Sequence, residues 1–303
     1  MVMACEHCII AGAPRSATTS LYNCLSGHVQ FASSSIKQTL FFLNADDEGT
    51  LLNKLEEGYG VADYLKYFPE NLNDLVTLEA TPDYIYSSGV AQRIYECLGE
   101  KAFIIFVLRD PVDRLVSCYH HEKQVGSVSG DVTVDEFIAG DDIDSLKNNV
   151  HVQQGEYSKF ISDFYRVFNR NQICVLFTED LASVDTEGMQ LLAERMDVDL
   201  SSVASDLRVR SNQRFQNKSE SLLRGYRVVR RFIIQLTSTS QFLNKMLSVP
   251  IKMGSMLYRR TNRTVVSASD EVSMKKRMLL KKYYSKSNLE LAALTGREIP
   301  WAS

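Results

Sequence analysis

The feature that most constrains the fold is a continuous apolar run, Ala-Phe-Ile-Ile-Phe-Val-Leu, at residues 102–108. A strand with apolar side chains on both faces has to be covered on both sides, and such strands are typical of parallel sheets with helices on each face. Shorter runs of the same kind occur at residues 8–12, 75–79 and 172–177. The pattern therefore predicts an α/β fold with a central parallel sheet.

Segments of helical periodicity alternate with these runs, as parallel strands require. Gly27 and Gly99 follow two of them and mark helix ends. We expect one domain over residues 1–303, with a sheet-forming part over about 1–200. The predicted helices of that part span residues 18–26, 88–98, 112–124, 157–168 and 185–195.

Strand signals fade beyond residue 200, which predicts a helical C-terminal portion. We expect helical structure over 218–247, a loop over 259–269 and a helix over 270–294. Ser267 or Ser269 is the expected N-cap of the last helix, and Gly296 lies just past its end. An apolar stripe at helical spacing predicts the buried face of this helix: Leu280, Tyr283, Tyr284, Leu291 and Leu294.

Charge divides the chain unevenly. Residues 1–200 hold 14 Lys/Arg and 31 Asp/Glu, a net charge of −17, whereas residues 201–303 hold 20 and 6, a net charge of +14. A basic C-terminal portion suits an anionic partner or attraction between the two parts. We expect no nucleic-acid partner, and the sequence leaves the oligomeric state open.

No apolar run approaches the roughly 18 residues of a membrane-spanning helix, so stable membrane insertion is not expected. Because the first predicted strand begins almost at Met1, we expect no leader and no membrane anchor. Six cysteines in a chain without a secretory signal are typical of reduced thiols. These observations predict a cytoplasmic protein. Cys5 and Cys8 have the spacing of half a zinc site, but no second pair follows, and we expect no metal.

The loop after the first predicted strand carries the most chemistry. Small residues between a buried strand and a helix expose successive backbone N–H groups beside the positive end of the helix dipole, which favours an anion. Arg15 adds a permanent charge suited to phosphate or sulfate oxygens. The segment lacks the Gly-Lys-Ser/Thr triplet of a loop that binds a nucleoside triphosphate. The alternative is that its hydroxyls only cap the helix. The run reads Ala13-Pro14-Arg15-Ser16-Ala17-Thr18-Thr19-Ser20-Leu21.

A second charged loop follows the strand at 102–108. Arg109 ends that strand, at the edge where open α/β sheets bind ligands, and Ser117 lies about two turns into the next helix. Together they suit a second phosphate. The alternative is that Arg109 pairs with Asp110 or Asp113 and only fixes the turn.

Taken together, the two loops resemble those of the sulfotransferases that use 3′-phosphoadenosine 5′-phosphosulfate (PAPS). That family has a Pro-Lys/Arg-Ser-Gly-Thr-Thr-type loop and an Arg-Asp/Asn-Pro…Arg…Ser-x-Tyr segment. Further stretches are similar to the carbohydrate, heparan-type and bacterial branch of the family. They are residues 37–42, Glu79-Ala80-Thr81-Pro82-Asp83-Tyr84, Thr178-Glu179-Asp180-Leu181 and the C-terminal Tyr283-Tyr284…Trp301.

The resemblance implies a P-loop-like sulfotransferase fold and in-line transfer of a sulfuryl group from PAPS to a hydroxyl or amine of a small-molecule or sugar acceptor, with 3′-phosphoadenosine 5′-phosphate (PAP) as product. It places Arg15 beside the transferred group and Arg109 and Ser117 on the 3′-phosphate. Lys37 is a candidate contact of the sulfuryl oxygens, and the alternative is a solvated surface lysine. The implied nucleotide contacts further include Ser16, Ala17, Thr18, Thr19 and Ser20. A basic C-terminal loop also covers the nucleotide in the family, and the candidates for it here are Arg210, Asn212, Arg214 and residues 259–263.

The chain departs from this pattern at the proton acceptor. The carbohydrate branch has Lys-Glu-x-His-Phe-Phe with Glu as base, whereas this chain has Lys37-Gln38-Thr39-Leu40-Phe41-Phe42. A Gln side chain accepts no proton, so the base is elsewhere, the acceptor is an amine, or the protein binds PAPS or PAP without transfer. Glu79 is the first candidate base because it ends a predicted strand, although a structural role fits it equally well. The other candidates are Asp83, His28 and His120. A phosphotransferase that uses the first loop is a more distant alternative.

Overall fold

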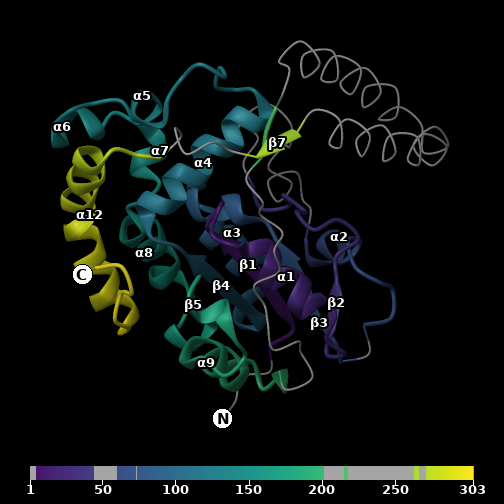
Figure 1. Cartoon of the computed structure of the whole chain (residues 1–303). Helices are drawn as coiled ribbons and strands as arrows, with labels where there is room; N and C mark the ends of the chain where they lie inside the picture. The colour runs from purple at the N-terminus through teal and green to yellow at the C-terminus, as the bar shows by residue number, and fades with distance from the viewer. Residues whose placement is uncertain are drawn as a thin grey trace. The chain divides into compact units, whose positions relative to one another are not determined.

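A computed structural model describes residues 5–43, 60–72, 74–200, 215–217, 263–265 and 271–302. Its centre is a five-stranded sheet in the order β2-β3-β1-β4-β5, and every neighbouring pair is parallel. The predicted parallel α/β fold is therefore confirmed (Figure 1). The strands are β1 (His7–Gly12), β2 (Phe31–Ser33), β3 (Val76–Ala80), β4 (Ala102–Leu108) and β5 (Ile173–Phe177).

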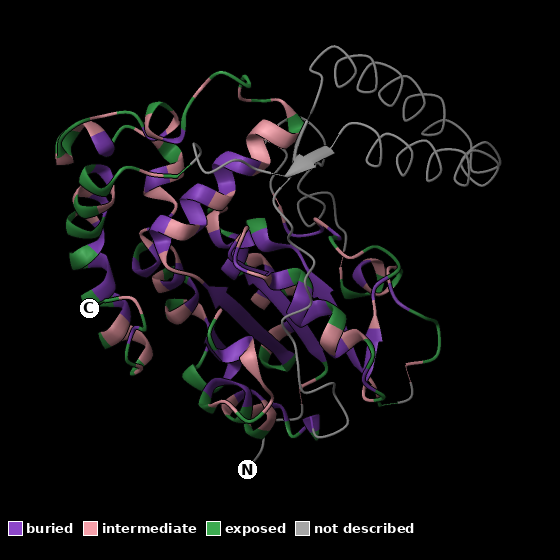
Figure 2. Cartoon of the chain, viewed as in Figure 1, coloured by how far each residue is buried: buried purple, intermediate pink, exposed green. Residues whose placement is uncertain are grey.

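The sheet is buried on both faces because its strands are apolar at successive positions. Side chains alternate between faces along a strand, and the core divides accordingly into two clusters. Cys8, Ile10 and Ile105 belong to one cluster, and Ile9 and Ile104 to the other. Figure 2 shows the resulting buried centre, with exposed residues on the surrounding helices.

Helices cover each face. The face of Ile10 packs against α1 (Thr18–Ser26) and α9 (Glu187–Met196). The face of Ile9 packs against α3 (Val90–Leu98) and α8 (Tyr157–Val167). The other elements are α2 (Val61–Leu65), α4 (Pro111–Val125), α5 (Val134–Ile138), α6 (Ile143–Leu146), α7 (Val150–Gln153), α12 (Met274–Thr295) and the short 3₁₀ helices η1 (Pro82–Tyr86), η2 (Gly99–Lys101), η3 (Arg170–Gln172) and η4 (Asp180–Ala182).

Contacts divide the chain into two compact units. The first contains the whole sheet and comprises Met1–Arg114, Val152–Ser211 and Lys281–Ser303. The second comprises Leu115–His151 and Asn212–Leu280. That residues 1–303 act as one domain stays a prediction. Among the described helices, none is both long and apolar enough to span a bilayer.

Helix α12 confirms the predicted C-terminal helix but begins later than expected. The expected caps Ser267 and Ser269 lie outside the described residues, and the Ser273 hydroxyl caps the helix by accepting the N–H of Lys276 at 3.3 Å. The end is as predicted, with Gly296 at φ 71° donating to the Ala292 carbonyl at 2.8 Å. Of the predicted apolar stripe, Leu280, Tyr284 and Leu291 are fully buried, while Tyr283 and Leu294 are half-buried.

Three short strands were not expected. Strand β2 has only three residues, too few to show a period, and forms through its pairing with β3. Strand β7 (Arg263–Val265) falls in the predicted loop 259–269 and pairs antiparallel with β6 (Phe215–Asn217). The loop prediction was wrong there because the partner strand is remote in sequence. The predicted helix at 218–247 lies outside the described residues.

A buried ion pair ties the end of the chain to the sheet. Arg297 donates to both carboxylate oxygens of Asp180, at 2.7 and 3.0 Å, and to the Val175 carbonyl at 2.9 Å. Asp180 also accepts the backbone N–H of Phe177 at 2.7 Å. Removal of either charge would leave the other buried and uncompensated, which is strongly destabilising. The pair therefore matters for the stability of the folded protein.

We predict that Asp180→Asn lowers the free energy of unfolding by about 2 kcal/mol, because it leaves the Arg297 guanidinium without its counter-charge. Urea unfolding followed by circular dichroism measures the change. The matched control is Asp163→Asn, which breaks a solvent-exposed pair with Arg166 and is expected to cost less than about 0.5 kcal/mol. Equal costs for the two variants would contradict this account.

Candidate functional site

Three polar segments meet at one edge of the sheet. Strands β3, β1 and β4 are adjacent and parallel, so their carboxyl ends lie at the same edge. The residues that follow are Thr81 after β3, the loop 13–17 after β1 and Arg109 after β4. Open parallel sheets bind ligands at this edge, which makes the three segments the candidate site.

The first loop is shaped to hold an anion. Arg15 and Ala17 both have positive φ angles, 69° and 62°, which non-glycine residues adopt rarely and chiefly at functional sites. Within the described part of the chain, the backbone N–H groups of Ala17, Thr18 and Thr19 donate to no backbone carbonyl. These N–H groups lie at the start of α1, where the helix dipole is positive, and so can bind phosphate or sulfate oxygens.

The Ser16 side chain supports the same conclusion. Its hydroxyl is fully buried, yet it makes no hydrogen bond of good geometry to any described residue. An unpaired buried polar group is costly, and an oxyanion in the loop would satisfy it. The start of the loop is also closely packed. Gly12 lies so near η1 that a Cβ atom at this position would approach Ile85 to 2.7 Å.

Lys37 joins this loop from another part of the chain. Its ammonium donates to the Thr19 hydroxyl at 2.7 Å and lies 5.9 Å from the centre of the Tyr22 ring. Partial burial lowers the pKa of Lys37, since the charged form loses hydration. The structure therefore brings Lys37 to the first loop, as its predicted role at the transferred group requires.

Glu79 lies in a closed cluster of hydroxyl groups. The carboxylate is fully buried. One oxygen accepts from Thr39 and Thr81 hydroxyls at 2.6 and 2.9 Å, and the other from Tyr64 and Tyr84 hydroxyls, each at 3.3 Å. Burial raises the pKa of Glu79, and the hydrogen bonds oppose this rise only in part.

This cluster fixes the segment that carries Lys37. The Thr39 backbone N–H also donates to Glu79 at 3.4 Å, and the Phe42 N–H donates to the Tyr84 hydroxyl at 3.2 Å. Gln38 is exposed, while Thr39 is buried. The observed contacts of Glu79 therefore position residues 37–42, and whether Glu79 also accepts a proton stays a prediction.

The second loop leads from β4 into α4. Asp110 caps this helix by accepting the N–H groups of Val112 at 2.7 Å and Asp113 at 3.2 Å. Arg109 is half-buried, and its backbone carbonyl accepts the Tyr157 hydroxyl at 2.8 Å. Ser117 lies further along α4, in the second unit. Arg210 and Asn212 lie outside the described residues.

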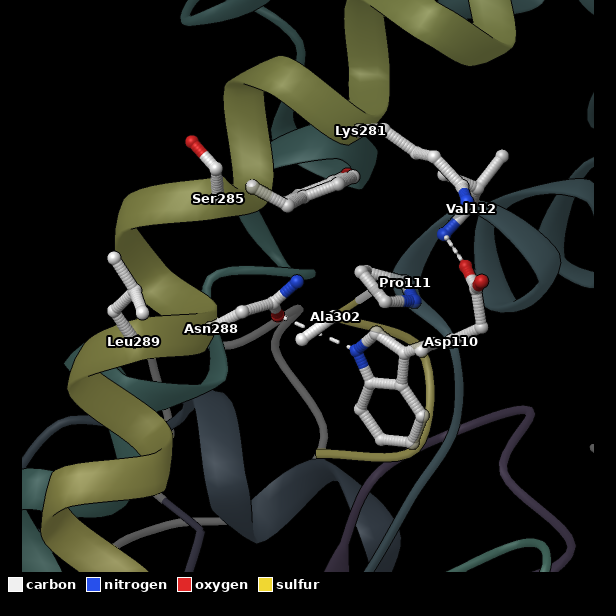
Figure 3. A pocket seen from close by; sticks show the side chains of 10 residues that line it. Asp110, Pro111, Val112, Lys281, Ser285, Asn288, Leu289 and Ala302 are labelled. Carbon is white, nitrogen blue, oxygen red and sulfur yellow. Dashed lines mark hydrogen bonds between the residues drawn. The ribbon is translucent and has the colours of Figure 1, made fainter. Parts of the chain in front are cut away.

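A pocket of about 320 Å³ opens beside the second loop (Figure 3). Asp110 and Pro111 line one side and α12 lines the other, with the Trp301 indole donating to the Asn288 carboxamide oxygen at 3.3 Å. The remaining lining residues are Val112, Lys281, Tyr284, Ser285, Leu289 and Ala302.

The other candidate bases differ in accessibility. His28 is buried, and both ring nitrogens are engaged, with the Asp199 carbonyl at 2.6 Å and the Gln30 N–H at 3.3 Å. Asp83 is exposed on η1, and His120 is buried in the second unit. His28 is therefore poorly placed to accept a proton from a substrate.

Sequence reasoning missed the tyrosines that support the site. Tyr64, Tyr84 and Tyr157 are all fully buried, and their hydroxyls bond to Glu79 or to the Arg109 carbonyl. Buried tyrosines in apolar surroundings look like ordinary core residues in a sequence. The signal that the sequence offers is the phenolic hydroxyl of each tyrosine, which needs a hydrogen-bond partner when it is buried.

Comparison with known proteins finds a matching family profile, similar sequences and a similar fold. Residues 6–248 match the sequence profile of the family described as "Sulfotransferase domain". Mouse (Mus musculus) carbohydrate sulfotransferase 15 is 24% identical over 229 residues, which cover 58% of this chain and 41% of that protein. Mouse bifunctional heparan sulfate N-deacetylase/N-sulfotransferase 1 is 31% identical over 176 residues, which cover 55% of this chain and 19% of that protein.

The chain thus aligns with less than half the length of these relatives. A crystal structure of a sulfotransferase from Alicyclobacillus acidocaldarius has the same fold, with a TM-score of 0.62, 19% identity and coverage of 96% of both chains.

We predict that Glu79→Gln gains stability relative to the wild type as the pH rises from about 5 to 8. Because the folded-state pKa of Glu79 is raised above that of an exposed carboxyl, the folded wild type binds this proton more tightly than the unfolded chain does. Its contribution to stability is present at low pH and is lost as the pH rises through that window. Gln carries no charge and lacks this dependence. Urea unfolding at several pH values measures the difference.

The matched control is Glu136→Gln. Hydrogen bonds with Thr133 lower the pKa of this exposed carboxyl, so both of its states titrate below the window and the difference from wild type is expected to stay constant from about pH 5 to 8. A Glu79→Gln variant that shows the same flat profile would contradict the prediction.

Proposed function

The chain belongs to the sulfotransferase family, and from this premise we propose that it transfers a sulfuryl group from PAPS to a hydroxyl or amine of a small-molecule or sugar acceptor. Family membership makes it a transferase of sulfuryl groups. The donor and the acceptor are the proposed part. The names of the two mouse relatives, a carbohydrate sulfotransferase and a heparan sulfate N-sulfotransferase, support a sugar as acceptor.

The observation that carries the proposal is the buried hydroxyl of Ser16, which has no hydrogen-bond partner among the described residues. Beside it, the N–H groups of Ala17, Thr18 and Thr19 donate to no described backbone carbonyl. These donors suit the 5′-phosphosulfate, since they lie next to one another at the start of α1, where N–H groups and the helix dipole favour an oxyanion. Arg109 at the next strand end suits the 3′-phosphate, because guanidinium groups bind phosphate oxygens through paired hydrogen bonds. Ser117 is the second proposed ligand of that phosphate.

The chemistry needs little beyond charge stabilisation. In the proposed step, a bond forms between the acceptor atom and sulfur while the bond from sulfur to the phosphate oxygen breaks, and the acceptor loses a proton to a base. Negative charge grows on the phosphate oxygen that leaves. Arg15 and Lys37 lie at the first loop to stabilise it, each contributing a few kcal/mol. The described residues hold no cluster of three metal-ligating side chains, and the proposal invokes none.

The proton acceptor is the least constrained part. We propose Glu79 as the base. A base has to come within hydrogen-bond reach of the proton that it takes, so the burial of Glu79 is the feature that an experiment has to address. An amine acceptor depends less on a general base than a hydroxyl does, because a neutral amine is the stronger nucleophile. One observation favours a second function: Gln38 is exposed in the position where the family pattern has Glu, which suits a protein that binds PAPS or PAP without transfer.

We predict that the protein binds PAP more tightly than ADP, ATP or 5′-AMP. Arg109→Ala is expected to raise the dissociation constant for PAP about tenfold or more and that for 5′-AMP by about twofold at most, because only PAP carries the 3′-phosphate. Isothermal titration calorimetry measures these constants. Arg166→Ala, an exposed arginine on α8, is the control and should change neither. Tighter binding of ADP or ATP than of PAP would instead favour a phosphotransferase.

We predict that Lys37→Met lowers kcat for sulfuryl transfer about 10²-fold, with a smaller effect on PAP affinity, because the ammonium acts mainly on the charge of the transition state. Transfer of ³⁵S from labelled PAPS to a panel of sugars and amines gives the rate. Lys66→Met is the control, since Lys66 is exposed and pairs with nearby Asp63 on the surface. A wild type that binds PAP but labels no acceptor would favour binding without transfer, and a Glu79→Gln variant with full activity would remove Glu79 as base.

A further inference from the structure

We propose that the exposed face of α12 is a peripheral membrane-binding surface, and that its partner is a bilayer with anionic headgroups. Seven residues of the helix define this α12 surface. Its apolar members are Met274, Met278 and Leu289, and its basic members are Lys275, Lys281, Lys282 and Lys286. None of these residues is proposed to contact the nucleotide, so the inference goes beyond the proposed function.

The apolar members form a stripe along one side of the helix. Met274, Met278 and Leu289 are 73%, 66% and 72% exposed. With 3.6 residues per turn, their three positions fall within about 60° of one another around the helix axis. Exposed apolar residues that are scattered singly need no explanation, whereas a row on one face is typical of an interaction surface.

Lysines flank the stripe on both sides. By the same helical spacing, Lys281 lies on one side of the stripe, and the other three lysines lie on the opposite side, within about 40° of one another. All four are exposed. The helix has six Lys/Arg and a single acid, Glu290, which lies 3.7 Å from Lys286. The resulting net charge of +5 complements a surface of anionic headgroups.

The other side of α12 is fixed to the protein. Leu280 and Tyr284 are fully buried, and the Tyr284 hydroxyl donates to the Val152 carbonyl at 2.8 Å. Lys276 is buried too, because its ammonium donates to the Gly140 carbonyl instead of facing water. Figure 2 shows exposed and buried residues alternating along α12 as the helix turns. The α12 surface is therefore ordered before a partner binds, which lowers the entropy cost of binding.

The combination of stripe and lysines favours a bilayer over a soluble polyanion. A polyanion engages the ammonium groups and leaves the apolar stripe in water. A bilayer takes both, since the stripe enters the boundary between headgroups and acyl chains while the lysines stay with the anionic headgroups. The long apolar stems of the lysines allow this, because the ammonium reaches the headgroups while the stem lies along the apolar region.

Sedimentation of the whole chain with lipid vesicles tests the inference. The probes are vesicles of phosphatidylcholine alone and vesicles that contain about one-third phosphatidylserine, to which we expect the wild type to bind about tenfold more strongly or better. Lys275→Glu/Lys282→Glu should weaken that binding about tenfold or more, because the anionic surface then repels the helix. Met274→Ser/Met278→Ser should weaken it about tenfold while the charge is unchanged, because the stripe no longer enters the bilayer.

Each variant has a matched control away from α12. Lys66→Glu/Lys159→Glu makes the same change of charge at two exposed lysines. Val29→Ser/Val61→Ser removes two exposed apolar side chains. Both controls are expected to change binding by about twofold at most. Thermal denaturation followed by circular dichroism checks that all four variants fold as the wild type does.

The outcomes are distinct. A folded wild type that binds neither kind of vesicle overturns the inference, as does vesicle binding that both α12 variants retain in full. Binding to heparin beads but not to vesicles, with no loss in Met274→Ser/Met278→Ser, overturns it in favour of a soluble polyanion. The vesicle measurements contain no nucleotide, so their result is separate from that of the PAP titrations that test the proposed function.

Discussion

The structure depends on the parallel pairing of β1 with β3 on one side and β4 on the other. Parallel strands end at the same edge, so this pairing places the first loop, the segment after Glu79 and Arg109 next to one another although they are far apart in the chain. It also requires apolar side chains on both faces, because helices cover both. The chemistry of the edge and the core of the protein thus follow from one arrangement of backbone hydrogen bonds.

Buried polar groups around that edge divide into two kinds. Glu79 is fully satisfied by hydroxyl groups, and its contacts hold the segment of Lys37 in place. Ser16 is buried, and its hydroxyl has no hydrogen-bond partner in the part of the chain that the structure describes. A satisfied cluster stabilises and rigidifies, whereas an unsatisfied donor is a cost that a bound anion removes. This contrast, more than the net charge of −17 over the first 200 residues, supports the proposed anion site at the first loop.

Much of the fold could be predicted from the sequence because most strands are continuous apolar runs. Ala102–Leu108, for example, forms β4 with the predicted bounds. Both loops were recognisable from the residues that follow such runs. Strand β2 and the pair β6–β7 were not, since three residues show no period and their partners lie elsewhere in the chain. The contacts of Glu79 and Tyr157 were also hidden, because tertiary packing alone decides which hydroxyl groups reach a buried carboxylate or carbonyl.

The central claim is that the edge formed by β1 and β4 is a site for two phosphate groups of one nucleotide. A crystal structure of the protein with PAP tests it most directly. The account predicts the 5′-phosphate within hydrogen-bond distance of Ser16 Oγ and the N–H groups at the start of α1, with the 3′-phosphate on the Arg109 guanidinium. PAP bound at another surface, with Ser16 Oγ still buried and unpaired, would contradict it.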